Sequence, residues 1–280
     1  MPEKRAKTQH LIAHYGFSVS KACKVLELSR SSYYYQVKRE ADGLLAKALL
    51  KRHHCHRVDG FWKLFYRLRA QGHTWNHKRV FRIYQELGLS LARRTAKKKN
   101  KRPACPLKVP QQTNVCWSVD FMSDAFDNGA GKNIPFRALN IIDDFNREVL
   151  CVEIGRSISA KHLLRKLGEL IEVRGKPQAI RSDNGPEYLA KVVKQWARKH
   201  QIDWRYIQPG KPTQNAYVVR FNGTLRQELF NLHIFDSLEQ VSELLEGWIE
   251  DFNQLRPHKA LKYLSPVAFA QKYDKRKLSS

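Results

Sequence analysis

Residues 115–122 read VCWSVDFM, an apolar run that is interrupted by a single acid, Asp120. The run predicts a buried β-strand, and further strands are expected at 136–142 and 149–154, with turn residues between those two. An unpaired carboxylate within a buried strand would cost several kcal/mol, so the side chain of Asp120 is expected to have a partner. This stretch therefore opens an α/β domain and supplies its first candidate functional residue.

The chain then continues with alternating helices and strands. Apolar spacing predicts a helix at 159–173, a strand at 178–182 and a second helix at 188–200. A fifth strand at 202–207 and a helix from about 215 to 229 complete the series. The order β-β-β-α-β-α-β-α, with its hairpin-linked start, predicts a ribonuclease-H-like α/β fold.

A second acid, Asp183, follows the predicted strand residues AIRS and opens the turn Asp-Asn-Gly-Pro. It therefore lies at the carboxyl end of a strand, where the sites of α/β proteins gather. Taken singly, Asp120 could be a structural acid with a partner, and Asp183 could be a turn former. Two carboxylates that converge from adjacent strands repel each other unless a cation lies between them, and Mg²⁺ prefers oxygen ligands. Together they predict a metal site.

Positive charge is concentrated in the first part of the chain. The protein has 280 residues, with 51 Lys+Arg against 26 Asp+Glu and a net charge of +25. Residues 1–110 hold 26 basic and 6 acidic residues, a net of +20, whereas residues 111–280 hold 25 and 20, a net of +5. A folded and strongly basic front half predicts a polyanion partner, most simply nucleic acid. A basic RNA-binding or ribosomal protein would show similar charge.

Two short helices are expected within residues 18–38, SVSKACKVLELSRSSYYYQVK. Ser18 or Ser20 would cap the first helix, and Ser29 would cap the second, which begins with Arg30. Short helices joined by a tight turn predict a helix-turn-helix-like segment, whose second helix would enter the DNA major groove. The alternative is an ordinary helical hairpin with a basic surface.

A second helical block is expected after residue 41, with apolar residues at helical spacing in 44–49, 61–68 and 80–87. Few acids intervene among its basic residues, so a DNA-facing surface is favoured over a merely solvated one. The basic residues expected on the polar faces are Arg67, Arg69, Lys78, Arg79 and Arg82.

Several other classes of protein and site are not expected. The cluster His53-His54-Cys55-His56 lacks a second ligand pair at zinc-finger spacing, and neighbours on one helix cannot all face one ion. No run approaches about 18 apolar residues, so no membrane-spanning helix is predicted. The N-terminus has no apolar run of the kind found in secretory signals. Five scattered cysteines without a C-x-x-C pair fit a reducing cytosol.

With these residues in view, the sequence resembles bacterial insertion-sequence transposases of the OrfB type, whose catalytic core is similar to that of retroviral integrases. The resemblance covers nearly the whole chain and disfavours the RNA-binding alternative. Four ordered segments carry it: WSVDF at 117–121, IRSDNGPEY at 180–188, QPGKPTQNAYVVRFNGTLRQE at 208–228 and FNQLRPHKALKYLSPVAF at 252–269.

The resemblance implies a division of the chain into five parts. These are a helix-turn-helix-like segment at 1–40, a helical DNA-binding region at 41–100, a basic Pro-containing linker at 101–112, an integrase catalytic core at 113–230 and a C-terminal helical segment at 231–280.

The family carries an Asp, Asp-x35-Glu triad, and its third position is altered here. Asp120 and Asp183 match the two aspartates, but the position of the glutamate is occupied by Val219. Residues 215–223 otherwise fit the family, which indicates a substitution and not a misalignment. A single base change converts a Glu codon into a Val codon, which fits either a decayed element or a deliberate inactivation.

No other acid is expected to replace the missing glutamate. Glu228 lies nine residues beyond position 219, on the opposite helix face and about 13 Å along the axis. Asn222 would offer only a weak neutral oxygen. The remaining candidates, in turns, are Asp143, Asp144 and Glu187.

The resemblance implies metal-dependent phosphodiester cleavage and strand transfer in DNA transposition and integration, with Mg²⁺ or Mn²⁺ held by Asp120 and Asp183. Val219 then predicts impaired catalysis. The alternative is a catalytically silent DNA-binding protein that occupies element ends or inhibits an active transposase. Lys211 and Arg226 are expected to meet DNA phosphates, although they could equally be a solvated loop lysine and a surface arginine.

The resemblance also implies the partners and the location. The expected partners are double-stranded DNA, both element ends and target, and further copies of the chain bound to it. An OrfA partner or fusion is possible in this family, and no membrane is involved. The expected location is the bacterial cytoplasm, in association with the nucleoid.

Overall fold

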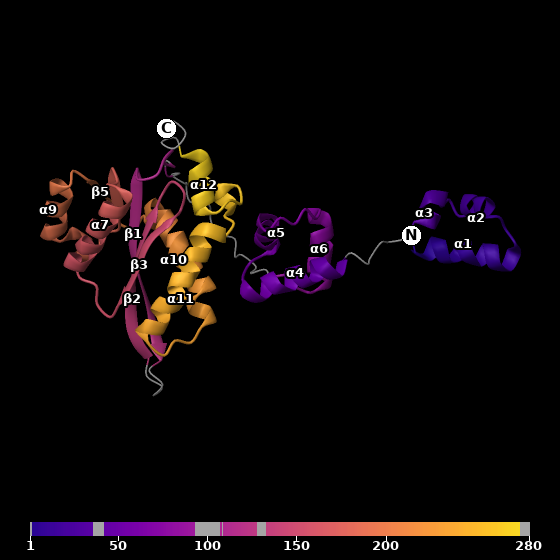
Figure 1. Ribbon diagram of the computed structural model, residues 1–280, viewed down its shortest axis with the longest axis horizontal. Coiled ribbons are helices and arrows are strands. Elements are labelled where there is room, and N and C mark those ends of the chain that lie inside the picture. Colours follow the sequence, from indigo (N-terminus) through magenta and orange to yellow (C-terminus); the bar gives the residue numbers. More distant parts are fainter. Residues whose placement is uncertain (1, 36–41, 93–106, 108, 128–132, 275–280) are drawn as a thin grey trace. The chain divides into compact units, whose positions relative to one another are not determined.

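The computed structural model describes residues 2–35, 42–92, 107, 109–127 and 133–274 (Figure 1). The chain divides into two compact units, residues 1–47 and residues 48–280. Most of the predicted basic linker at 101–112 lies outside the described residues. None of the helices in the described ranges combines the length and the apolar character that crossing a bilayer requires.

The helices that lie wholly within the first unit, among the described residues, are α1 (Pro2–Tyr15), α2 (Val19–Val25) and α3 (Arg30–Tyr34). The two predicted helices are confirmed, and the serine caps are Ser18, which accepts from the backbone of Lys21, and Ser29, which accepts from that of Ser32. Helix α1 is not predicted by apolar spacing, because its sequence PEKRAKTQHLIAHY has few apolar residues.

Three more helices follow, α4 (Asp42–Cys55), α5 (Phe61–Ala70) and α6 (His77–Glu86), and they confirm the predicted helical block. Leu64 and Leu68 of α5 and Val80 and Ile83 of α6 are buried, as their spacing predicts. Gly88, with φ +65°, adopts the left-handed conformation that ends α6. One expectation fails here, because Arg67 is only 5% exposed and therefore does not belong to a solvent-facing surface.

The rest of the second unit is built on a five-stranded mixed sheet of order β3-β2-β1-β4-β5. β1–β2 and β2–β3 are antiparallel, whereas β1–β4 and β4–β5 are parallel, and this topology confirms the predicted ribonuclease-H-like fold. The strands are β1 (Cys116–Asp127), β2 (Asn133–Asp143), β3 (Val149–Gly155), β4 (Ala179–Ser182) and β5 (Asp203–Tyr206).

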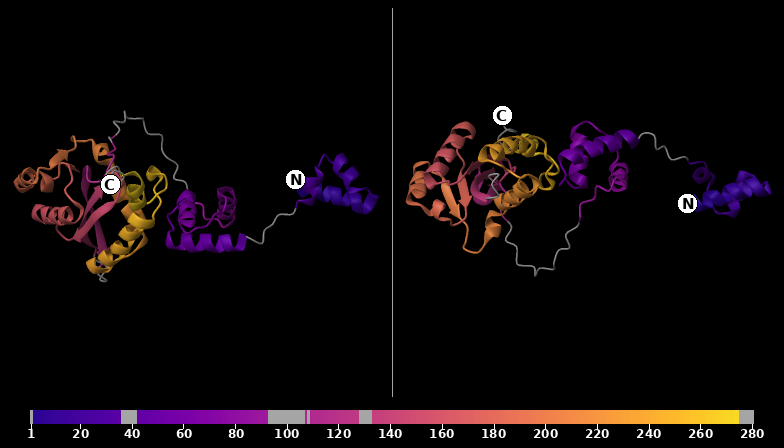
Figure 2. Two further views of the ribbon diagram at one scale, coloured as in Figure 1. Left: turned by 45° about the horizontal axis from the view of Figure 1, so that its top comes forward. Right: turned by 90° about the horizontal axis from the view of Figure 1, so that it is seen from below.

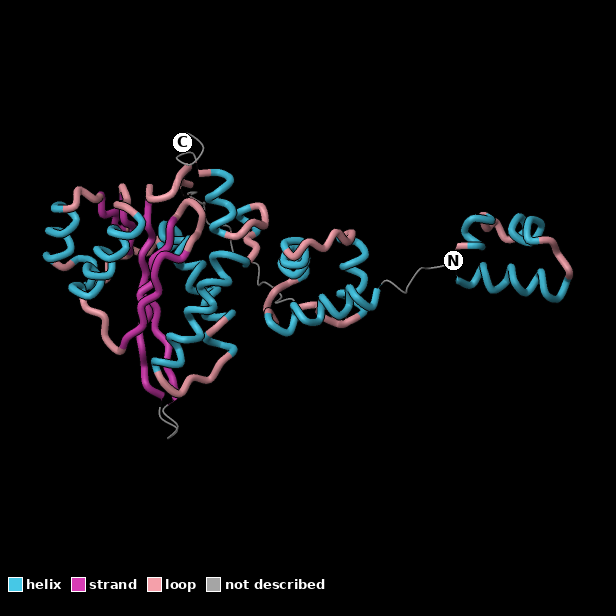
Figure 3. Tube along the Cα trace, in the orientation of Figure 1, coloured by secondary structure: helices cyan, strands magenta, loops and turns pink. Residues whose placement is uncertain are grey.

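Helices cover both faces of this sheet. Trp117 and Val119 of β1 pack in the cluster that includes α7 (Ala160–Arg174), whereas Met122 packs in the cluster that includes α10 (Ala216–Glu228) and α11 (Leu238–Glu250). Figure 1 shows α7 on one side of the strands and α10 and α11 on the other, and Figures 2 and 3 show the same layers. Because side chains alternate along a strand, Asp120 lies on the same face as Met122, toward α10.

One helix prediction is wrong in detail. The helix expected at 188–200 is two helices, α8 (Pro186–Leu189) and α9 (Lys191–Lys199), because Ala190 between them adopts an extended conformation, with φ −55° and ψ 140°. Between β5 and α10 the chain makes one short 3₁₀ turn, η1 (Pro212–Asn215).

The C-terminal segment belongs to the same unit as the sheet. Its elements are η2 (Phe230–Leu232), α11, the π-helical turn η3 (Asp251–Leu255), η4 (Lys259–Leu261) and α12 (Pro266–Tyr273). Val241, Leu245 and Phe252 complete the core over one face of the sheet. Residues 231–273 therefore contribute to the fold of the core and not only to its end.

Candidate active site

The topology brings the two candidate aspartates together. β1 and β4 pair in parallel, with Ser118 opposite Arg181. Asp120 and Asp183 each lie two residues further along the chain from this pair. Both line one cavity of about 560 Å³, together with the loop residues 207–212. The sheet therefore positions the pair at one edge of the core, as the sequence predicts for converging carboxylates.

The environment of Asp120 disfavours its charged form. Burial and the nearby carboxylate of Asp183 raise the pKa of Asp120 from 3.8 to about 6. Two donors act against this rise, because the Phe121 amide donates to Oδ1 at 3.0 Å and the Asn222 side-chain amide donates to Oδ2 at 2.8 Å. Asp183 in turn accepts from the Gly185 amide at 2.9 Å.

Val219, the position to which the resemblance assigns the third member of the triad, lines the same cavity. Val218, Phe221 and Leu225 of α10 pack on the sheet, whereas Val219 beside them is 45% exposed and lines the cavity with Asp120 and Asp183. An isopropyl group offers neither charge nor a ligand atom. The cavity therefore holds two carboxylates and an apolar side chain at the three positions that the triad would occupy.

The four acids considered as replacements have other partners, and none of them lines this cavity in the part of the chain that the structure describes. Asp144 binds Arg181 at 2.7 Å, Glu187 binds Arg137 at 2.6 Å and Asp143 accepts from two backbone amides. Glu228 binds Lys63 and Arg256. Asp120 and Asp183 are therefore the acids that line this cavity within the described residues.

The donor set fits one hard divalent cation. Carboxylate oxygens are the ligands that Mg²⁺ and Mn²⁺ prefer, and a cation between Asp120 and Asp183 would relieve the repulsion of the two groups. A third protein carboxylate, which would complete the shell of a second ion, is absent at position 219. Within the described ranges, no group of three or more His, Cys, Asp or Glu side chains is arranged to hold a metal ion.

The candidate DNA-binding residues are placed in different surroundings. Lys211 lines the cavity with the aspartates, whereas Arg226 donates to the Ser123 carbonyl at 2.7 Å and is not among the lining residues. Arg30 is exposed at the start of α3, in the first unit. On α6, the side chain of Arg82 pairs with Glu86 at 2.9 Å and is 44% exposed, and Arg79 is half-buried.

Two asparagines form a polar chain that the sequence reading missed. Asn140 of β2 lies opposite Asp120 in the β1–β2 register and is fully buried. Its amide donates to the side-chain oxygen of Asn222 at 2.7 Å, and Asn222 then donates to Asp120. Asn222 therefore acts on Asp120 as a hydrogen-bond donor, and its oxygen is not the free ligand that the sequence suggested. In the sequence, the sign of this arrangement is that the polar residue Asn140 stands in an otherwise apolar run.

Comparison with known protein families agrees with this geometry. Residues 110–212 match an integrase core domain family, and residues 200–266 match a second family that is also described as an integrase core domain. The two matches together span the sheet, the cavity and helices α10 and α11.

Several proteins from bacterial insertion elements are similar along most of the chain. The insertion element IS407 uncharacterized 31.7 kDa protein of Burkholderia multivorans is 36% identical over 257 residues, which cover 91% of each chain. The insertion element IS476 uncharacterized 39.2 kDa protein of Xanthomonas euvesicatoria is 33% identical and covers 96% of this chain and 77% of its own length. The putative transposase InsK for insertion sequence element IS150 of Escherichia coli is 24% identical, covering 90% and 93%.

Among solved structures, a chain in the cryo-EM structure of the simian T-cell lymphotropic virus intasome in complex with PP2A regulatory subunit B56 gamma has a TM-score of 0.52. The alignment covers 81% of this chain and 74% of that chain at 18% identity. At that identity the likeness concerns the fold alone.

Proposed function

Because this chain belongs to the family of bacterial insertion-sequence transposases with an integrase-like core, we propose that it acts in DNA transposition through a catalytically impaired centre. It would bind the ends of its element, while phosphodiester cleavage and strand transfer would be slow. The observation that carries the proposal is that Val219 lines the cavity of Asp120 and Asp183 where the family has glutamate.

Asp120 and Asp183 would hold a divalent cation, Mg²⁺ or Mn²⁺. Such an ion would supply charge for a scissile phosphate and for the oxygen that leaves. In families with an intact triad, two ions share this work, and the third carboxylate helps to hold one of them. With Val219 in that place, one ion would keep two protein carboxylates, whereas the other would lose the carboxylate that the family has at position 219.

The residues of the chain itself would position the DNA and the acids. Asn222 keeps the Oδ2 atom of Asp120 fixed toward α10 by its hydrogen bond of 2.8 Å. Lys211, on the loop that lines the cavity, would attract a phosphate by its charge. Double-stranded DNA would also meet the basic residues Arg30, Arg79 and Arg82, and further copies of the chain would assemble on it.

A second candidate function follows from the same observation. If the residual chemistry is negligible, the chain would be a DNA-binding protein that occupies element ends and inhibits an active transposase. It is favoured because the described carboxylates at 143, 144, 187 and 228 do not line the cavity and each has another partner.

Binding and chemistry must be measured separately to distinguish these functions. End-sequence DNA and random duplex of equal length are titrated with the full chain, and Mg²⁺-dependent cleavage and joining are measured on the same end DNA, beside the Val219→Glu variant. End-preferring binding with weak cleavage supports the proposal, and end-preferring binding with no cleavage supports the inhibitor. Robust and equal strand transfer by both chains contradicts both.

A further inference from the structure

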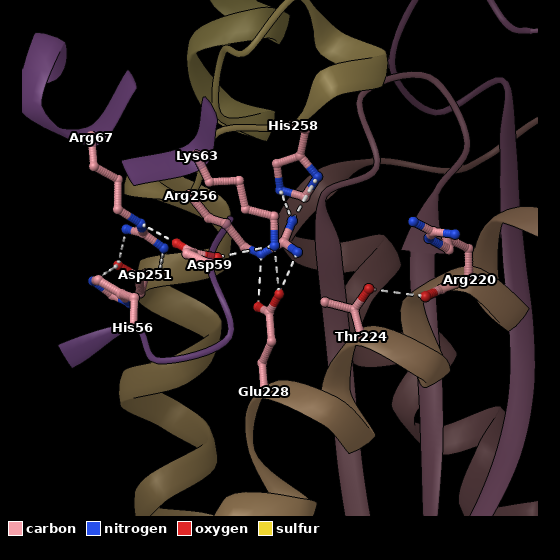
Figure 4. A network of polar contacts seen from close by, with 10 residues as sticks. All are labelled: His56, Asp59, Lys63, Arg67, Arg220, Thr224, Glu228, Asp251, Arg256 and His258. Atoms are coloured by element: carbon pink, nitrogen blue, oxygen red, sulfur yellow. Dashed lines mark hydrogen bonds and ion pairs between the residues drawn. The ribbon is translucent and has the colours of Figure 1, made fainter. Parts of the chain in front are cut away.

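A buried ionic network joins α5 to the end of α10 (Figure 4). Glu228, the last residue of α10, accepts from Lys63 of α5 at 2.8 Å. It also forms a two-pronged pair with Arg256, whose Nη2 and Nε atoms lie 2.6 and 2.8 Å from the two carboxylate oxygens. These contacts connect segments that are 165 and 28 residues apart in the chain.

The network continues along α5 to a second pair of acids. Lys63 also lies 3.0 Å from Asp59, and Asp59 accepts from Arg67 at 2.9 Å. Arg67 then forms a bidentate pair with Asp251 of η3, with distances of 2.7 and 2.6 Å. Three acids and three bases therefore balance in charge, and none of the six side chains is more than 27% exposed.

The neighbouring groups fix the geometry of Arg256. Its guanidinium lies over the Phe252 ring, 5.2 Å from the ring centre, and Nη1 lies 3.2 Å from the Nδ1 atom of His258. Burial and the adjacent Arg256 lower the pKa of His258 to about 3, so a neutral imidazole faces the guanidinium and can accept from it. A bidentate pair held in this way is rigid, and its low exposure limits screening by salt.

An aromatic contact between the same two regions supports this arrangement. The Tyr66 ring of α5 stacks on the Tyr263 ring at 4.2 Å between centres and 10° between planes. Lys262 and Tyr263 both adopt left-handed backbone conformations, with φ 55° and 62°, which are unfavourable for residues other than glycine. The local strain is therefore tolerated at the point where the C-terminal segment meets α5.

From these contacts we infer that Glu228 is a positioning residue, which holds α5 and α10 in one fixed arrangement. Helix α5 carries exposed Arg69 and packs on α6, whereas α10 carries Val219, which lines the cavity, and Asn222, which donates to Asp120. DNA held by the helical block would thus be presented to the carboxylate pair at a set position. The part of this inference that concerns DNA rests on the proposed function; the coupling of the two helices does not.

Local hydrogen exchange in the full chain tests the coupling without DNA. Glu228→Gln and Lys63→Gln each remove one charge of the network, and each should raise the exchange rates of α5 amides about tenfold, while β2 amides change less than about twofold. The matched controls are Glu153→Gln and Lys166→Gln, which break a pair of similar exposure on β3 and α7, at 3.1 Å. They should leave the exchange of α5 unchanged.

Two exchange results would overturn the inference. One is unchanged protection of α5 in both variants, and the other is an equal rise in α5 and β2, which would indicate a general loss of stability. If Glu228→Gln does not fold, hydrogen exchange in Lys63→Gln decides whether the network couples the helices, because Lys63 is the more exposed partner.

A functional readout separates positioning from stability. In a Val219→Glu background, adding Glu228→Gln should lower the cleavage rate at saturating DNA about tenfold, with the DNA Kd within about threefold, because each binding surface remains intact. An unchanged cleavage rate contradicts the positioning role. If Val219→Glu itself is inactive, the proposed function has failed and hydrogen exchange alone decides the coupling.

Discussion

Asn222 donates a hydrogen bond to one oxygen of Asp120, and a donor of this kind favours the ionised carboxylate. Replacing Asn222 with Ala should therefore raise the pKa of Asp120 further above 6, by about half a unit to one unit. Carboxyl-carbon NMR titration of the two chains measures the shift. A pKa of Asp120 that stays the same or falls would show that the amide does not stabilise the charge.

Asp120 also predicts how stability depends on pH and metal. The pKa of Asp120 is raised in the folded state. Its favourable contribution to the free energy of unfolding is therefore complete below about pH 4 and is lost as the pH rises through 6. At pH 8 without divalent ions, Asp120→Asn should therefore unfold at higher urea, with a gain of about 3 kcal/mol. Adding Mg²⁺ should stabilise the unchanged chain and not the variant. A variant that is less stable at pH 8, or equally stabilised by Mg²⁺, contradicts this account.

At the scale of elements, the core is predictable because its signals are local. Apolar spacing predicts the helix at 215–229, which is found at Ala216–Glu228, and the residues around Asp120 predict β1. The two aspartates were also identified from the sequence, since each stands at a distinctive point of a strand. The pairs Arg67–Asp251 and Lys63–Glu228 were not, because their members lie 184 and 165 residues apart and no local periodicity encodes them.

The contact between α5 and α10 predicts an acid-sensitive part of the stability. Burial alone would raise the pKa of Glu228, but the pairs of this carboxylate with Arg256 and Lys63 outweigh burial and lower its pKa from 4.5 to about 2. The stabilisation is therefore present above about pH 4.5 and is lost as the pH falls toward 2. The free energy of unfolding of the unchanged chain should drop by about 3 kcal/mol more than that of Glu228→Gln between pH 5 and pH 2. Parallel pH curves for the two chains in urea unfolding would refute this.

At the scale of the whole molecule, the distribution of charge determines the expected behaviour toward DNA. The sequence predicts the division into a basic helical part and a nearly balanced core, with net charges of +20 and +5. The sequence does not predict which basic side chains interact with other groups of the protein. Arg67 is buried between Asp59 and Asp251, and Arg226 is directed to the backbone of β1.

Exposed basic residues in both units should each contribute to DNA affinity. Arg30→Gln and Lys211→Gln should each weaken binding to any duplex and reduce the slope of log affinity against log salt by about one. Arg205→Gln is a suitable control, because Arg205 is an exposed arginine that already pairs with Asp203 at 2.6 Å. Salt-dependent titrations of the three variants measure this, and unchanged slopes for both test variants would remove these residues from the DNA surface.

The central claim, that the side chain at position 219 limits the chemistry, is tested most directly by single-turnover cleavage of end-sequence DNA in Mg²⁺. The unchanged chain is compared with Val219→Glu and with Val219→Gln, which has similar size to Glu but no charge. We expect Val219→Glu to be about 100-fold faster than the unchanged chain and Val219→Gln to remain slow, because the missing group is a carboxylate. A rate for the unchanged chain within about threefold of that for Val219→Glu would contradict the claim.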